Sequence, residues 1–165
     1  MIFRITKKLA KKIKAEPAPA MPPHDNPFLD WTANLFMVSR WQCIILTNSA
    51  SLYSVVFPGK GVPNKQAFVE ESIKALRENI ALDGIMHIFD TKIASALDSV
   101  SFCKTGDRRV LGSMNELVFQ AKVDFLHMGR SLQLVNHGLN RTLLSPLKGQ
   151  YPIEAFVVLD SQRGE

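Results

Sequence analysis

The sequence of 165 residues contains only two cysteines, and neither belongs to a metal-binding or redox pattern. Cys43 and Cys103 each stand alone in an apolar or strand-like run, so we expect two buried, reduced thiols rather than a disulfide. The four histidines show none of the HxH, HxxxH or HExxH spacings of metal sites. From these patterns we expect neither a metal nor a cofactor, and no catalytic motif is recognisable.

Long apolar runs are also missing. No stretch approaches the run of about 18 apolar residues that a membrane span needs. The N-terminus lacks the apolar core of a secretory signal, so we expect a cytoplasmic protein. The length of the whole sequence and its apolar content of 46% suit a single domain over residues 1–165.

Acidic residues are absent from the first 14 positions, which hold six of the 20 Lys and Arg residues. The formal charge of +5 comes from this segment, because residues 15–165 carry 14 basic and 15 acidic side chains. Nucleic-acid-binding proteins usually spread basic residues over a folded face. Residues 7–14 are therefore a weakly supported nucleic-acid contact. The simpler interpretation is a short helix with solvated lysines over a docked apolar edge.

Local patterns that are present predict an α+β fold. Proline-rich residues 16–27 hold five of the nine prolines and predict a linker or an extended strap. Three adjacent β-rich runs predict an antiparallel meander whose middle run, 41–47, is a central strand buried on both faces. Together we expect an antiparallel sheet of about five strands, covered mainly on one face by helices. Strands are expected at 2–6, 32–38, 41–47, 52–57 and 100–104.

Helices are predicted from caps and from apolar spacing. Asn64 caps a helix that runs to about Leu82, and Asp107 caps one that runs to about Met128. Residues 131–144 and 153–159 predict a helical C-terminal part over residues 130–165. Residues 85–97 fit a helix or a strand equally well.

Three ordered blocks carry a resemblance to a known family. They are IFRITKKLAKKIK, WTANLFMVSRWQCIILTNSASLYSVVF and FCKTGDRRVLGSMNELVFQAK. They resemble a bacterial family of uncharacterised domain-of-unknown-function proteins with LTxKLxKKL, WxANLF…LLTNxxSLYSV and KTxDRSVLGSMN blocks. The resemblance covers about residues 2–125 and departs from the pattern at Arg109, where the family has Ser. It implies a shared fold and surface, and no reaction.

The segment KTGDRR, residues 104–109, contains the candidate site. Asp107 as N-cap places Arg108 and Arg109 in the first helical turn, where the helix dipole disfavours cations. A bound anion would relieve this conflict, with Arg108 as its main contact. Alternatively, the arginines pair with Asp107, Asp90 or Asp98, or lie in solvent. The full candidate anion-binding set is Lys104, Thr105, Asp107, Arg108, Arg109, Ser113 and Asn115.

The sequence favours a non-enzymatic binding or accessory module that recognises a protein or an anionic small molecule through residues 104–115. Two alternatives remain open. One is a nucleic-acid-associated protein that uses the basic N-terminal helix. The other is an enzyme acting on a phosphorylated substrate, with polar groups supplied by the same turn.

Overall fold

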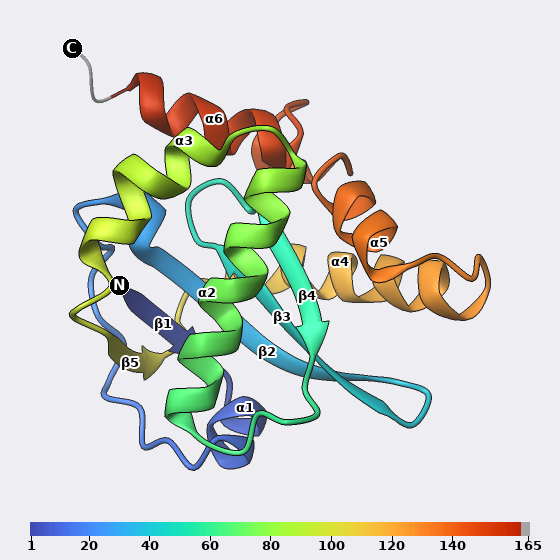
Figure 1. The fold of residues 1–165 in the computed structure, drawn as a ribbon, viewed down its shortest axis with the longest axis horizontal. Helices are drawn as coiled ribbons and strands as arrows, with labels where there is room; N and C mark the ends of the chain where they lie inside the picture. Colours follow the sequence, from blue (N-terminus) through green and yellow to red (C-terminus); the bar gives the residue numbers. More distant parts are fainter. Residues whose placement is uncertain (163–165) are drawn as a thin grey trace.

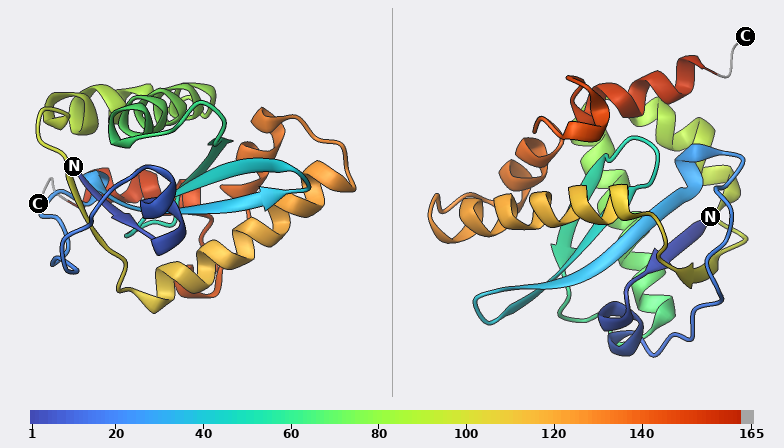
Figure 2. Two further views of the ribbon diagram at one scale, coloured as in Figure 1. Left: turned by 90° about the horizontal axis from the view of Figure 1, so that it is seen from below. Right: turned by 180° about the vertical axis from the view of Figure 1, so that it is seen from behind.

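The computed structural model describes residues 1–162. It has a five-stranded sheet with helices on both sides (Figures 1 and 2). The strand order is β4–β3–β2–β1–β5. The last three residues of the predicted C-terminal part, 163–165, lie outside the described residues. The strands are β1 (Ile2–Ile5), β2 (Asp30–Val38), β3 (Trp41–Asn48), β4 (Ser54–Pro58) and β5 (Ser101–Lys104).

The predicted antiparallel sheet is wrong in part, because the sheet is mixed. Strands β2, β3 and β4 form the expected antiparallel meander, but β1 lies between β2 and β5 and is parallel to both. The cause is the connection after β1. The helix α1 (Lys7–Lys12) and the proline-rich residues 16–27, called the strap below, return the chain to the starting end of β1. Asp30 therefore pairs with Ile2, and β2 runs in the direction of β1.

Helices cover both faces of the sheet, not mainly one as predicted (Figure 2). The helices α2 (Lys65–Leu82), α3 (Met86–Ile88) and α6 (Pro152–Ser161) cover the face with Phe3, Trp31 and Leu46. The helices α4 (Arg108–Leu126) and α5 (Leu132–Leu139) cover the face with Ile45 and Val56. Both faces of the meander are apolar, which explains why each needs a helical layer.

The predicted boundaries of α2 and α4 agree closely with the structure, whereas α5 ends at Leu139, before the predicted residue 144. The Asn64 side chain accepts the Ala67 N–H at the start of α2, and Gly84 follows its end with a φ of 75°. The undecided residues 85–97 are helical, because α3 continues into the π-helix η2 (Phe89–Ile93) and the 3-10 turn η3 (Ala94–Ala96). Two more 3-10 turns are η1 (Pro27–Leu29) and η4 (Ser145–Leu147).

The middle strand β3 is internal, as expected, but its burial is uneven. Residues 44–47 are fully buried, whereas Trp41 at its start is 75% exposed. Cys103 is buried and Cys43 is half-buried, and both are free thiols. The expectation of two buried thiols is thus right for Cys103 and only partly right for Cys43.

The two outer strands are covered by other parts of the chain. The strap covers β5, because Ala18 donates its N–H to the Phe102 carbonyl (3.1 Å) and accepts the Lys104 N–H (2.9 Å). The helix α5 covers β4 with Asn136 and Asn140, whose amides bind the main chain of the strand. Covered edges present no free peptide groups for pairing with another chain.

The basic helix α1 is docked on the core. Leu9 and Ile13 are fully buried, while Lys7, Lys8 and Lys11 are exposed. This arrangement agrees with the simpler of the two interpretations of the basic segment. Among residues 1–162, no helix has the length and apolar character needed to cross a membrane.

Candidate functional site

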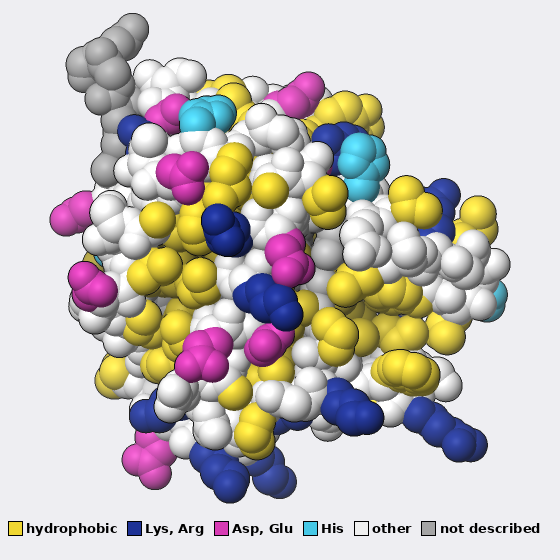
Figure 3. Space-filling view, in the orientation of Figure 1, with side chains coloured by type: hydrophobic (Ala, Val, Ile, Leu, Met, Phe, Trp, Pro, Cys, Tyr) yellow, Lys and Arg dark blue, Asp and Glu magenta, His cyan; other side chains and the backbone are white. Residues whose placement is uncertain are grey.

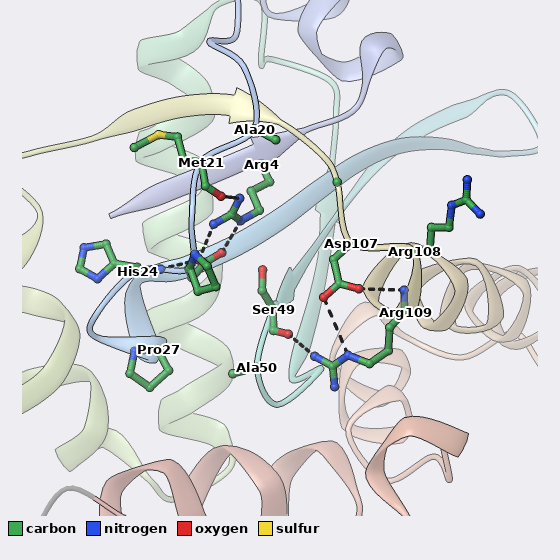
Figure 4. Close-up of a pocket in the computed structure, with 13 residues that line it drawn as sticks. Arg4, Ala20, Met21, His24, Pro27, Ser49, Ala50, Asp107, Arg108 and Arg109 are labelled. Atoms are coloured by element: carbon green, nitrogen blue, oxygen red, sulfur yellow. Dashed lines mark hydrogen bonds and ion pairs between the residues drawn. The ribbon is translucent and has the colours of Figure 1, made fainter.

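A cavity of about 670 Å³ opens where two coverings of the sheet meet. On the face of the sheet with Ile45 and Val56, α4 packs over β2 and β3, whereas the strap lies along β5 and over β1. The cavity lies between them and is closed at one side by the turn after β3 (Figure 4). The strap, the start of β2 and the start of α4 are far apart in the sequence and contribute to one cavity.

A buried ion pair lies at the base of the cavity. Arg4 projects from β1, and its Nε and Nη2 atoms each donate to the Asp30 carboxylate over 2.8 Å. The same guanidinium donates to the carbonyl oxygens of Met21 (2.7 Å) and Pro22 (2.9 Å). Arg4 thus ties the strap to the sheet, and its donors are occupied by the protein itself.

The environment keeps both members of this pair charged. Burial alone would raise the pKa of Asp30, but hydrogen bonds from Arg4 and from the His24 N–H outweigh burial and lower this pKa. The hydrogen bond to Asp30 raises the pKa of Arg4. The pair therefore contributes no net charge to the cavity.

The start of α4 forms the opposite wall. As predicted, Asp107 caps the helix, with its Oδ1 accepting the N–H groups of Arg109 (2.8 Å) and Val110 (3.3 Å). The Arg109 guanidinium donates to the Ser49 carbonyl over 2.7 Å, and its Nε lies 3.9 Å from Asp107 Oδ2. Arg108 is exposed, and Figure 4 shows its guanidinium directed away from this pair.

Only part of the predicted set gathers here. Asp107, Arg108 and Arg109 line the cavity. Lys104 pairs with Ile5 in the sheet, so its side chain lies on the face opposite Arg4. Thr105 precedes the lining residues and is half-buried.

The other two predicted residues lie further along α4. Ser113 is buried, and its hydroxyl has no hydrogen-bond partner among residues 1–162. Asn115 is exposed on α4, outside the cavity lining. The cavity therefore unites three of the seven candidates.

The cavity lining also includes residues that were not predicted from the sequence, namely Arg4, His24, Asp30 and Ser49. One signal was present, since Arg4 is a lone charge within an apolar strand and needs a buried partner. His24 accepts the Asn26 N–H at Nδ1 over 2.9 Å, so Nε2 is the ring nitrogen available to donate. Apolar lining comes from Met21, Pro23 and Pro27, among others.

The charged side chains leave a positive surplus. With Arg4 and Asp30 paired, the lining keeps two guanidiniums, Arg108 and Arg109, and one carboxylate, Asp107. The alternative in which an arginine pairs with Asp107 applies to Arg109. Within residues 1–162 neither arginine forms an ion pair with Asp90 or Asp98, and no three His, Cys, Asp or Glu residues gather in a metal-binding arrangement.

Comparison with known proteins identifies the family. A model described as a domain of unknown function (DUF6933) matches residues 2–155. No curated protein matches the sequence. The match confirms the resemblance to an uncharacterised family and extends it beyond residue 125, through α5 and into the start of α6. The chain therefore belongs to the family of domain-of-unknown-function proteins DUF6933.

Proposed function

We propose that this protein is a binding module that holds a small organic anion in the cavity between the strap and α4. The observation that carries the proposal is the charge surplus. The lining residues outside the internally neutral Arg4–Asp30 pair carry two guanidiniums and one carboxylate, and Arg109 is the arginine whose guanidinium faces the cavity in this rotamer. An anionic group would balance that surplus and the positive end of the α4 dipole together.

Arg109 is the best-positioned contact. Its hydrogen bond to Ser49 and its approach to Asp107 hold the guanidinium in place, while further N–H donors of the fork remain. Arg108 is exposed and reaches the cavity by a change of rotamer, so we assign it the supporting role. Asp107 occupies the N–H groups of Arg109 and Val110, so side chains supply more of the recognition than the helix end.

The size and lining of the cavity favour an organic ligand over a bare inorganic ion. Its volume of about 670 Å³ falls within the range of small-molecule pockets. Proline and methionine side chains line the strap side, opposite the arginines. A ligand with an anionic head and an apolar body matches both walls.

Catalysis on a phosphorylated substrate has less support. Of the polar groups considered for it, Ser113 is buried inside the helix layer, and Asn115 lies outside the cavity. Asp107 uses one carboxylate oxygen as the helix cap. A binding role needs neither Ser113 nor Asn115, and Asp107 serves it by holding Arg109 and the start of α4 in place.

Thermal melting with two probes tests the proposal. We expect phenyl phosphate to raise Tm more than inorganic phosphate at equal concentration and ionic strength, because its ring contacts the apolar wall. At about 100 times Kd, a ligand adds about 2.7 kcal/mol of stability. In a protein of this size each kcal/mol shifts Tm by about 2–4 °C.

Variants separate binding from the general stabilisation that phosphate gives any protein. Arg109→Lys removes the bidentate fork and Arg108→Ala removes the supporting charge, so both should lose most of the phenyl phosphate shift. Arg77→Ala, an exposed arginine on α2, is the matched control and should keep it. An equal shift in all four proteins would exclude an anion site at this cavity.

A further inference from the structure

A second hollow, separate from the anion cavity, lies near the other end of α4. It has a volume of about 310 Å³ and is formed by the β2–β3 hairpin, the end of β4, the end of α4 and the start of α5. We call it the hairpin groove. Its lining is mainly apolar and includes Trp41, Cys43, Phe57, Phe125, Leu126 and Leu132.

The hairpin groove is flanked by unusually exposed apolar side chains. Trp41 is 75% exposed and Leu126 is 53% exposed, and both line the groove. Met37 and Met128, in the same hairpin and just after α4, are also exposed. Trp31, by contrast, is fully buried in the core. Adjacent exposed apolar residues around a hollow are typical of an interaction site.

The charged side chains beside the groove that reach solvent are basic, since Asp124, just before Phe125, is buried and pairs with Arg130 over 3.2 Å. Arg40 lies in the turn between the lining residues Ser39 and Trp41, and Lys12 donates to the lining residue Gln42 over 2.7 Å. Lys60 follows Gly59, whose N–H binds the Gln42 carbonyl. The segments that line or adjoin the groove, 7–14, 38–43, 57–61 and 125–132, contain no Asp or Glu.

The space-filling view agrees with this distribution. Figure 3 shows hydrophobic side chains between α5 and the β2–β3 hairpin, with Lys and Arg side chains along the lower edge. On the same face, acidic side chains lie over α2. Glu71 and Glu78 of α2 belong to a neighbouring hollow that also contains Lys74.

We propose that the hairpin groove docks an acidic segment of a partner protein. An apolar side chain of that segment fills the groove against Trp41 and Leu126. Its carboxylates lie near Arg40 and Lys12. The apolar hollow supplies the anchor, and the basic side chains at the hairpin edge select against basic segments.

Other occupants fit less well. A second copy docked groove to groove would bring the same cations together, which like-charge repulsion opposes. An anionic membrane would meet the positive rim, but a lipid surface has no need of a walled hollow. Single-stranded nucleic acid would stack on Trp41, yet the other aromatic lining residues offer no open face, because Phe57 is buried and Phe125 is half-buried.

The experiment begins with selection of short random displayed peptides on the intact protein. We expect the enriched peptides to be rich in Asp and Glu and to share a large apolar residue. Binding of a synthesised winner is then followed by tryptophan emission. Trp41 is the exposed reporter and Trp31 is buried, so a blue shift reports burial at the groove.

Matched variants locate the contact. Trp41→Ala and Leu126→Ala should each weaken binding of the selected peptide by at least about tenfold. Leu143→Ala should not, because Leu143 is 64% exposed but lies outside the groove lining. Arg40→Glu should also weaken binding, whereas Lys65→Glu on α2 should leave it unchanged. All substituted side chains are exposed, and melting curves check that each variant folds.

Each other outcome overturns the proposal. These outcomes are no enrichment, enrichment of basic peptides, or equal binding to wild type and Trp41→Ala. Binding of phosphatidylserine vesicles or of oligo-dT that requires Trp41 would assign the groove to a membrane or to nucleic acid. Concentration-dependent dimerisation lost in Trp41→Ala would assign it to a second copy.

Discussion

The Arg4–Asp30 pair holds the strap against the sheet, and its removal should be costly. Both side chains are buried, and Arg4 also binds two strap carbonyls. Asp30→Asn leaves a buried guanidinium without its counter-charge, which costs about 3–5 kcal/mol of unfolding free energy. Asp25→Asn, an exposed change in the same segment, should cost almost nothing. Urea titration at neutral pH measures both, and equal stability of the two variants would contradict this role.

The same pair predicts a pH dependence with a definite sign. The pKa of Asp30 is lowered in the folded protein, so its stabilisation is complete above the ordinary aspartate value, about 4. This stabilisation is lost as the pH falls from the ordinary aspartate pKa through the lowered pKa of Asp30 in the folded protein. The difference in unfolding free energy between wild type and Asp30→Asn should therefore be constant from neutral pH to about pH 5. It should shrink below about pH 4, and a gap that persists at lower pH would refute the linkage.

At the scale of single residues, local rules predicted some positions and missed others for identifiable reasons. The capping role of Asp107 follows from its place before a helix, and it is confirmed. Ser113 could also have been placed correctly. It lies three residues after Val110 and one before Met114, a helical spacing that places it on the same buried face as these apolar residues. Arg4 could not be paired with Asp30, because their contact depends on β1 lying beside β2.

Among the elements, α5 has a specific role at the sheet edge. Asn136 accepts the Val56 N–H over 2.7 Å and donates to the Val56 carbonyl over 3.0 Å. Asn140, one helical turn later, binds the N–H and carbonyl of Ser54 over 2.7 and 2.8 Å. Two amides therefore satisfy the peptide groups that a neighbouring strand would otherwise bind.

Removing both amides should expose this edge. We expect Asn136→Ala/Asn140→Ala to lose several kcal/mol of stability, since each unsatisfied buried group costs about 1–3 kcal/mol. The free edge should also promote association, measured by light scattering after size exclusion. Asn115→Ala, an exposed position on α4, is the control. A monomeric double variant of wild-type stability would show that the amides do not protect the edge.

The elements themselves were largely predictable, whereas their arrangement was not. Asn64, Gly84 and Asp107 mark helix ends by local chemistry, and the turn at Ser39–Arg40 joins neighbouring strands. The parallel position of β1 depends on where a long proline-rich connection ends, and no local pattern encodes that. The anion cavity shares this dependence, because the strap forms one of its walls.

For the whole molecule, the N-terminal segment is a structural member rather than an appended arm. Strand β1 joins β5 to the meander, and α1 buries Leu9 and Ile13 in the larger core cluster. Deletion of residues 1–14 would leave β5 without its strand neighbour and remove the Arg4 anchor of the strap. We expect the truncated protein to lose cooperative thermal unfolding, followed by circular dichroism.

Within residues 1–14, the effect of the lysine charges on stability can be measured separately from the effect of β1 and the buried face of α1. The variant Lys7→Gln/Lys8→Gln/Lys11→Gln removes three exposed charges but keeps β1 and the buried face of α1. Its Tm should remain within a few degrees of wild type, because solvated lysines contribute little to stability. If the truncated protein instead melted at the wild-type temperature, β1 would be dispensable and the segment would be a detachable basic arm. A nucleic-acid role would then have to be tested by measuring DNA binding at increasing salt concentration, because counterion release makes such binding fall steeply with salt. The triple glutamine variant, which lacks three of the lysine charges, is the control for this measurement.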